Sequence, residues 1–386
     1  MTPTRLSCAA LYAALALGGL GVPASALAEI TVKKGDAVGD WLNRIDIQVG
    51  GSIRWQYVNR MGAIDDGSYR HKIYDGGTRF RFTGTYRIDP NTYFKAYYEP
   101  GVDTFHLLGA ANHYDGSDRR LTTRQRYIAL HSDKWGELSI GKQNSIYYDT
   151  VGVKTDVWDD DMQAQGPSNG VNADYDGSYR GRRLVNYFNR LGNLDFYLSA
   201  ILPSDTLDVP GGGPEYSRDF GGAIALNYHI NDALELSAAY TYTRANLKQP
   251  RAGRDERVEK GQQLAGLGLL WTPGRWYGAI GGGYYRNFVP AGRPALSDYL
   301  ARDAYGIEAY LSREFATPLG ILKSTKPYIA ADRLQRTSGN RYQSTHEYIG
   351  TSLMLAAGWR IDIERTFTQT SDDLPDENWV RLRYDF

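Results

Sequence analysis

Residues 79–88 read RFRFTGTYRI, and the side chains alternate between two kinds along this stretch. One set is apolar or aromatic and consists of Phe80, Phe82, Tyr86 and Ile88. The other set is basic or polar and consists of Arg79, Arg81, Thr83 and Arg87. Successive side chains of an extended chain point to opposite faces, so a period of two indicates a β-strand. The segment is predicted to be a strand with one apolar face and one strongly charged face.

The same period of two recurs along the chain, and no convincing amphipathic helix interrupts it. Sixteen such segments are predicted: 45–58, 77–88, 92–99, 122–131, 136–142, 180–190, 193–201, 220–229, 233–244, 262–272, 276–287, 302–313, 326–335, 346–356, 357–367 and 378–386. Several joins are short and carry turn residues, such as Asn231-Asp232 and Pro273-Gly274. Others are long and polar, at 59–76, 100–121, 202–219, 245–261 and 368–377.

The composition narrows the class of protein. The chain has 386 residues with 44 basic and 44 acidic side chains, and this neutral balance argues against a nucleic-acid-binding protein. No internal run of 18 apolar residues exists, so a membrane-spanning helix is not predicted. The mean hydropathy of −0.49 looks soluble, but 30 Tyr and 43 Gly are unusual for a soluble protein.

Residues 1–28 have the layout of a secretory signal peptide. Arg5 precedes an apolar stretch, and Ala26-Leu27-Ala28 forms a small-residue cleavage site before Glu29. One alternative is a buried N-terminal helix. The other is a lipoprotein signal, but such a signal has its cysteine at the end of the apolar run, whereas Cys8 lies at its start. The mature chain, 29–386, then has no cysteine and forms a single domain. Residues 29–44 are either a periplasmic extension or part of the first strand.

An apolar–polar alternation without long apolar runs is what a membrane barrel requires. In lipid every backbone donor and acceptor must be bonded within the protein, so a sheet must close on itself. Short turns alternating with long loops are typical of outer-membrane barrels. We therefore predict an all-β fold, a 16-stranded antiparallel transmembrane β-barrel. A large soluble β-sandwich would show the same period and stays open as an alternative.

The C-terminal strand supports export to the outer membrane. Val380, Leu382, Tyr384 and Phe386 alternate with polar residues, and the chain ends on the aromatic Phe386. This ending resembles the signal by which the barrel-assembly machinery recognises its substrates, with Tyr384 and Phe386 as its aromatic residues. The alternative is an ordinary exposed terminal strand.

The stretch 122–190 resembles the enterobacterial-type general diffusion porins. The most specific match is Tyr148-Asp149-Thr150-Val151-Gly152-Val153-Lys154-Thr155-Asp156, preceded by Gly141-Lys142. The resemblance implies a homotrimeric porin of the Gram-negative outer membrane, in contact with lipid and lipopolysaccharide. It also implies a third loop, 143–179, folded into the barrel, and a water-filled channel for passive diffusion of small hydrophilic solutes and ions.

In that family, acidic residues on the third loop face arginines on the opposite wall. The resemblance places Arg79, Arg124 and Arg180 in this basic wall, and counting side-chain parity adds Arg54, Arg81 and Arg126. The acidic residues of the loop that are predicted to face this wall are Asp156, Asp159, Asp160 and Asp161. The Pro-Glu-Phe-Gly-Gly hinge of the family is absent, and residues 158–163 read WDDDMQ instead. The alternative is that the arginines only brace the barrel.

The sequence allows three more specific interpretations of the site. The clustered aspartates could bind Ca²⁺, but their spacing matches no EF-hand loop. Ser168-Asn169-Gly170 resembles a motif of outer-membrane phospholipases, but no histidine is spaced to activate Ser168. Inward tyrosines at 93, 97, 197 and 310 could form a sugar track, which would make a selective channel for oligosaccharides or anionic metabolites. We expect no enzyme activity, no catalytic residue, no metal and no cofactor.

Overall fold

The computed structural model describes residues 29–37, 39–61, 71–110, 120–249, 255–292, 295–338 and 341–386. The predicted signal peptide, 1–28, lies outside the described residues. No helix in these ranges is long and apolar enough to cross a membrane.

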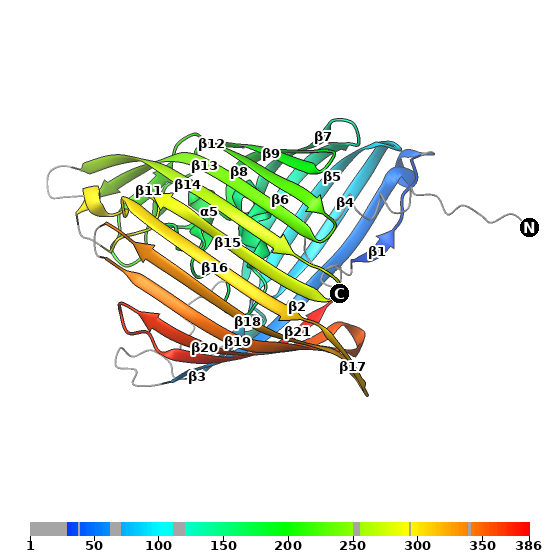
Figure 1. Cartoon of the computed structure of the whole chain (residues 1–386). Coiled ribbons are helices and arrows are strands. Elements are labelled where there is room, and N and C mark those ends of the chain that lie inside the picture. The colour runs from blue at the N-terminus through cyan, green and yellow to red at the C-terminus, as the bar shows by residue number, and fades with distance from the viewer. Residues whose placement is uncertain are drawn as a thin grey trace, which may run out of the picture.

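The described residues form sixteen long antiparallel strands, where β3 and β4 together make the second strand. Their bounds are β2 Ile45–Met61, β3 His71–Asp75, β4 Arg79–Asp89, β5 Thr92–Val102, β6 Leu121–Ser132, β7 Gly136–Asn144, β8 Arg180–Leu191, β9 Leu194–Ile201, β12 Gly221–Asn231, β13 Leu234–Gln249, β14 Glu256–Trp271, β15 Trp276–Arg286, β16 Asp303–Arg313, β18 Leu322–Arg336, β19 Gln343–Leu355, β20 Trp359–Thr370 and β21 Asp376–Asp385. All sixteen strands predicted from the sequence are present. Each strand pairs with the next along the chain, and Figure 1 shows the resulting barrel.

The barrel closes where the first strand meets the last. β2 pairs antiparallel with β21 from Ser52↔Asp385 to Met61↔Asp376, and it pairs with β3 and β4 on its other side. A closed sheet leaves no edge with unpaired backbone groups. This is required in lipid, because no water is present there to form hydrogen bonds with the backbone. The soluble sandwich considered above is therefore excluded.

Short strands extend the barrel at its ends. β1 (Ile30–Lys33) pairs with β2 through Ile30↔Val49, and the short helix η2 (Trp41–Arg44) leads into β2. Part of the segment 29–44 is thus paired into the sheet beside the first strand. β10 (Leu207–Asp208), β11 (Glu215–Arg218) and β17 (Phe315–Leu319) lengthen other connections, and β11 pairs with β13. β13 and β14 also run further than expected, because polar residues continue their hairpin through 245–249 and 256–261.

Side chains alternate between an exposed outer face and a covered inner face. On β16, Tyr305, Ile307 and Leu311 are exposed, whereas Glu308 and Tyr310 are buried. Apolar side chains on the outside match hydrocarbon, and polar side chains on the inside match a hydrated lumen. The inner residues of β16 are buried because another part of the chain covers them.

That covering segment is the connection between β7 and β8, residues 145–179, called loop 3 below. It carries α3 (Ile146–Thr150), η3 (Gly152–Lys154), α4 (Gly166–Asn169) and α5 (Ala173–Asp176). The hydroxyl of Ser145 begins α3 by accepting a hydrogen bond from the backbone N–H of Tyr148 at 3.1 Å. Tyr147, Ala164 and other buried residues of loop 3 form a core with inner residues of β12, β14 and β15.

Candidate pore constriction

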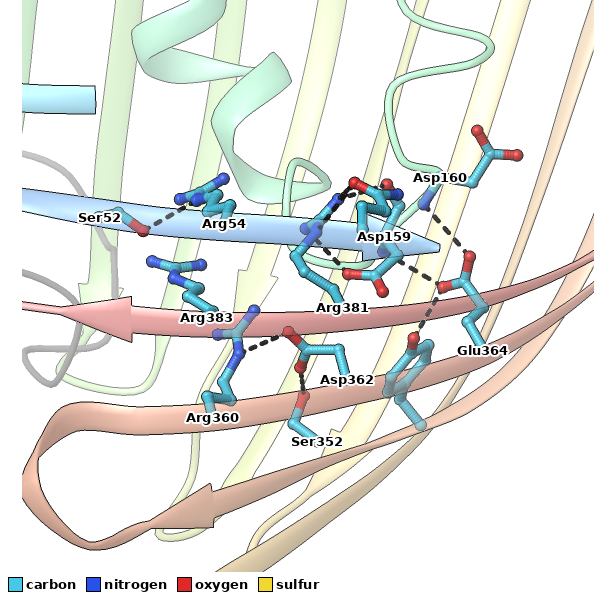
Figure 2. Close-up of polar contacts among 12 residues, drawn as sticks. Ser52, Arg54, Asp159, Asp160, Ser352, Arg360, Asp362, Glu364, Arg381 and Arg383 are labelled. Carbon is cyan, nitrogen blue, oxygen red and sulfur yellow. Dashed lines mark hydrogen bonds and ion pairs between the residues drawn. The ribbon is translucent and has the colours of Figure 1, made fainter. Parts of the chain in front are cut away.

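Basic side chains gather on the inner face where the barrel closes. Figure 2 shows Arg54 of β2 beside Arg383 of β21 and Arg360 of β20. In register, Arg54 lies opposite Arg383, and Arg383 lies opposite Arg360. Arg79 lies on the neighbouring strand β4, on the same face as the buried Arg81 and opposite the buried Ser52 of β2.

Arg81 also lies on the inner face. Its side chain is buried, and its Nε lies 4.0 Å from a carboxylate oxygen of Glu29. The segment that precedes β1 therefore contacts the inner wall of β4.

Arg124 and Arg180 lie on the wall from which loop 3 departs. The Nε of Arg124 donates to Glu99 at 2.7 Å, and Glu99 is a buried residue on the inner face of β5. Arg180 donates to the hydroxyl of Tyr179, and its guanidinium lies 3.8 Å from the centroid of that ring. The hydroxyl of Tyr179 in turn donates to Asp156 at 3.1 Å. The two arginines are thus connected to acidic groups of the wall and of loop 3.

Arg126 does not line the lumen, and the expectation for this residue was wrong. It is exposed and lies opposite Tyr98, which is exposed and stacks with the exposed Phe82 at 6.4 Å. The cause is a β-bulge, because Glu99 pairs with Gln125 whereas Pro100 pairs with Thr123. The extra residue, Arg124, shifts the alternation by one position. Arg124 and Arg126 therefore point to opposite faces, which a parity count of a regular strand does not reveal.

The acidic tip of loop 3 is bonded to the closing strands. Asp159 forms an ion pair with Arg381 of β21 at 2.8 Å (Figure 2). The carboxylate of Glu364 on β20 accepts the backbone N–H groups of Asp159 and Asp160, each at 3.2 Å. The hydroxyl of Tyr328 also donates to Glu364, at 2.7 Å. The tip is therefore fixed to the wall by both side-chain and backbone contacts.

The acidic residues at 156 and 159–161 of loop 3 have different electrostatic surroundings. Burial tends to raise the pKa of Asp156, but hydrogen bonds from Asp161 and Tyr148 and the charge of Arg180 lower it to about 2. Burial and the charge of Asp156 raise the pKa of Asp161 well above its usual range, so the two carboxyls share a proton. Burial raises the pKa of Asp159 to about 6 in spite of Arg381.

Asp160 points away from Asp159 in Figure 2. Its carboxylate accepts a hydrogen bond from Gln163 at 2.7 Å. Burial and the charges of Glu377 and Glu364 raise its pKa well above the usual range.

Loop 3 bends without the family hinge by means of an aromatic contact and a left-handed residue. The indole of Trp158 stacks on Tyr310 with a centroid distance of 5.6 Å and an interplanar angle of 5°, and it also contacts Tyr348. Met162 has a φ of 65° and reverses the chain. The backbone N–H of Ala164 then donates to Glu308 at 2.8 Å. The sequence WDDDMQ thus supplies its own bend.

Three basic residues of this site were missed in the sequence: Arg360, Arg381 and Arg383. The alternation of β20 and β21 already places them on the polar face. Their meeting with Arg54 could not be read from the sequence, because it depends on closure between the first and the last strands.

The structure does not support the sharper interpretations of the site. Tyr310 is covered by Trp158, and Tyr197 is buried against Phe188 at 4.9 Å, so these two rings cannot offer a continuous track to sugars. Ser168 lies in α4, and no contact between Ser168 and a histidine is recorded among the described residues. The described ranges also contain no group of three or more His, Cys, Asp or Glu arranged to hold a metal ion.

The C-terminal aromatic residues lie at the seam of the barrel. The backbone N–H of Phe386 donates to Gly51, and the carbonyl of Phe386 accepts from Gly51 at 2.7 Å. The ring of Tyr384 contacts Trp359 at a centroid distance of 4.9 Å.

Comparisons with known proteins agree with this architecture. A family model described as Gram-negative porin matches residues 10–285. No curated protein sequence matches the chain significantly. OmpF of Salmonella typhi, solved in complex with daunomycin, is 14% identical with a TM-score of 0.66, and the match covers 90% of this chain and 100% of OmpF.

Two further solved structures are similar. The trimer form of OmpT from Vibrio cholerae is 14% identical with a TM-score of 0.58, covering 89% of this chain and 99% of OmpT. A double mutant of the porin of Rh. blastica is 16% identical with a TM-score of 0.53, covering 88% and 100%. The family match spans well over half of the sequence and the strands close into the same barrel. The chain therefore belongs to the Gram-negative porin family and is a general diffusion channel of the bacterial outer membrane.

Proposed function

We propose that solutes cross this channel between the acidic side chains of loop 3 and a basic wall that carries Arg54, Arg79 and Arg81, with Arg124 and Arg180 where this wall meets loop 3. The observation that carries the proposal is the separation of charge across the lumen-facing residues. Asp156 and Asp161 lie on loop 3, whereas arginines of four different strands lie on the wall. Low-dielectric walls focus the field between such groups, and charged linings set ion preference in pores.

Such a field favours small polar solutes. A dipolar or charged solute exchanges its hydration for contacts with the charged lining, whereas an apolar solute gains nothing for the water it loses. Passage then needs no covalent step, and we propose that the protein acts as a channel without enzyme activity. Hydrolysis of phospholipid or peptide by the purified protein, abolished by Ser168→Ala, would contradict this.

We propose a homotrimer that is exported with residues 1–28 as its signal peptide and inserted by the barrel-assembly machinery among lipid and lipopolysaccharide. OmpT of Vibrio cholerae, which shares the fold, has been solved in a trimer form. The test is the pattern of insertion into a planar bilayer. Conductance rising in three coupled levels per event supports a trimer, and single independent levels contradict it.

Selective transport of anionic metabolites is a second candidate function. The Arg54, Arg360 and Arg383 cluster favours it, because these side chains outnumber the carboxylates beside them. Selectivity for oligosaccharides lacks such support, since Tyr197 and Tyr310 are covered. Liposome-swelling rates for neutral sugars and dicarboxylates of similar size test the difference.

A further inference from the structure

Four arginines follow one line across four neighbouring strands at the seam of the barrel. They are Arg79 of β4, Arg54 of β2, Arg383 of β21 and Arg360 of β20, called the arginine row below. Arg54 lies directly opposite Arg383, and Arg383 lies directly opposite Arg360. Like charges that face one another on adjacent strands destabilise a sheet. The row therefore has an electrostatic cost that a bound anion would offset.

The hydrogen bonds within the row engage only one nitrogen of each guanidinium. The Nε of Arg54 donates to Ser52 at 3.0 Å, that of Arg360 to Asp362 at 2.8 Å, and that of Arg383 to Asp385 at 2.8 Å. In the described part of the chain, no hydrogen bond is recorded for the terminal nitrogens of these three side chains. These terminal donors form the planar fork that binds carboxylate and phosphate oxygens.

The carboxylates nearby do not balance the charge of the row. Asp362 and Asp385 contact two of the four guanidinium groups, those of Arg360 and Arg383 respectively. Asp362 also lies opposite Arg381, so its charge is shared with a further cation. The loop carboxylate of Asp159 forms its direct ion pair with Arg381, and its charge acts on Arg360 and Arg54 only at longer range. Arg54 and Arg79 form no ion pair within 4.0 Å in the described ranges, although Glu99 and Asp156 act on Arg79 at longer range. Four guanidinium groups therefore face two directly paired carboxylates, which is an excess of two positive charges in the row.

The row is placed where a solute could reach it. The side chains of Arg360 and Arg383 keep exposed fractions of 18% and 11% on the inner face. Figure 2 shows Arg54, Arg383 and Arg360 side by side, apart from the Arg381–Asp159 ion pair. The free donors thus line the lumen next to the tip of loop 3 rather than being used to hold the tip.

We propose that the arginine row is a binding site for a small dianionic oxyanion of the phosphate type, an inference that rests on the proposed diffusion function. Hydrogen phosphate carries the two negative charges that the row lacks, and its oxygens accept from the forks of adjacent guanidinium groups. Binding is weak enough to permit release, because conduction requires both entry and exit. The channel therefore conducts phosphate through a saturable step.

The test is single-channel current of the full-length mature porin in a planar bilayer, with potassium phosphate at pH 8 compared with potassium chloride. Phosphate current is expected to saturate with concentration while chloride current stays closer to linear. Added phosphate is also expected to reduce the chloride current of the unmodified channel. This second measurement does not depend on any variant.

The variant is Arg54→Gln combined with Arg79→Gln, which removes two of the four forks and retains a hydrogen-bonding side chain at each position. The half-saturating phosphate concentration is expected to rise at least about tenfold, since hydrogen bonds between charged groups are stronger than those between neutral groups. The matched control is Lys95→Gln, which removes a cation of β5 whose partner is Glu137 at 2.8 Å. It is expected to change half-saturation less than twofold.

Two results would overturn the site. One is a linear phosphate current with no effect of phosphate on the chloride current. The other is an equal change in the double variant and in Lys95→Gln, which would indicate a distributed field. If chloride conductance and swelling with a neutral sugar are normal in either case, the diffusion function stands and only the site fails. Absence of any conductance would instead contradict the diffusion function.

Discussion

Gly306 lies on the inner face of β16 directly beneath loop 3. A Cβ atom at this position would lie 1.8 Å from the carbonyl oxygen of Ala164, so no residue with a side chain fits without displacing loop 3. Gly266 of β14 makes room in the same way for the ring of Tyr147, which would lie 2.6 Å from a Cβ atom. The position of the constriction therefore depends on individual glycines of the opposite wall as well as on the charged residues.

Replacing Gly306 by alanine is expected to move loop 3 away from β16. The displaced segment includes Ala164, whose backbone bond to Glu308 holds the tip. Single-channel conductance and the size limit measured by liposome swelling should both change. The control is Gly84→Ala on β4, where a Cβ atom would meet nothing within 4 Å. Unchanged conductance in Gly306→Ala would show that loop 3 is not held at this position.

Asp159 makes the charge of the lumen depend on pH. Its pKa is raised to about 6 by burial, so between pH 7 and pH 5 the carboxylate takes up a proton. The loss of this negative charge breaks the ion pair with Arg381, and the lumen becomes more positive. The reversal potential in a salt gradient is therefore expected to shift toward anion preference as the pH falls through about 6.

Asp159→Asn is expected to reduce this shift. Asp205→Asn, which changes an exposed carboxylate paired with Arg183 at 2.6 Å, should retain it. A full shift in Asp159→Asn would assign the titration to other groups.

At the scale of the element, loop 3 is held by a small number of contacts along its length. Lys154 forms an ion pair with Glu235, the hydroxyl of Tyr277 donates to the carbonyl of Lys154 at 2.9 Å, and Trp158 inserts between Tyr310 and Tyr348. Trp158 is only 4% exposed and is the largest apolar side chain at the tip. Its burial fixes the tip relative to β16 and β19.

Trp158→Ala is expected to release the tip. Truncation of a buried aromatic residue costs about 3–5 kcal/mol, and the contacts with Tyr310 and Tyr348 are lost together. Current noise in the open channel should rise, and the temperature at which the folded barrel is lost should fall. Trp135→Ala provides the control, because Trp135 is 68% exposed in a short turn. Equal effects of the two substitutions would show that Trp158 does not hold the tip of loop 3 in place.

The last strand is an element that both closes the barrel and carries the aromatic ending. Deletion of Phe386 removes the two backbone hydrogen bonds to Gly51 and the proposed assembly signal. We expect less folded barrel in the outer membrane while export to the periplasm continues, as measured by heat-modifiable migration of membrane fractions. A normal yield of folded protein would contradict the proposed role.

How far the sequence predicts this structure depends on the range of the interaction. The period of two in segments such as 79–88 and 378–386 predicts all sixteen strands. It does so because successive side chains of a strand face lipid and the lumen in turn, which depends only on the local sequence. The same rule fails at Arg126, since the bulge at Arg124 arises from pairing between β5 and β6. It also misses the meeting of Arg54 with Arg360 and Arg383, which only ring closure creates.

At the scale of the whole molecule, closure of the barrel brings basic residues that are far apart in the sequence onto one wall. Loop 3, which carries the acidic residues, faces this wall. The basic residues come from strands at both ends of the sequence, and the acidic residues come from a single loop near its middle. Neither group is complete until β2 pairs with β21 and loop 3 enters the barrel. The central claim is that this arrangement sets the ion preference of the channel.

The measurement that tests this claim most directly is the reversal potential of the purified channel in a planar bilayer under a potassium chloride gradient. Replacing Arg79, Arg124 and Arg180 together by glutamine is expected to move the potential toward cation preference, because three positive charges leave the wall. Arg126→Gln, which changes an arginine on the outer face, is expected to leave the potential unchanged. An unchanged potential in the triple variant, or an equal shift in Arg126→Gln, would contradict the account.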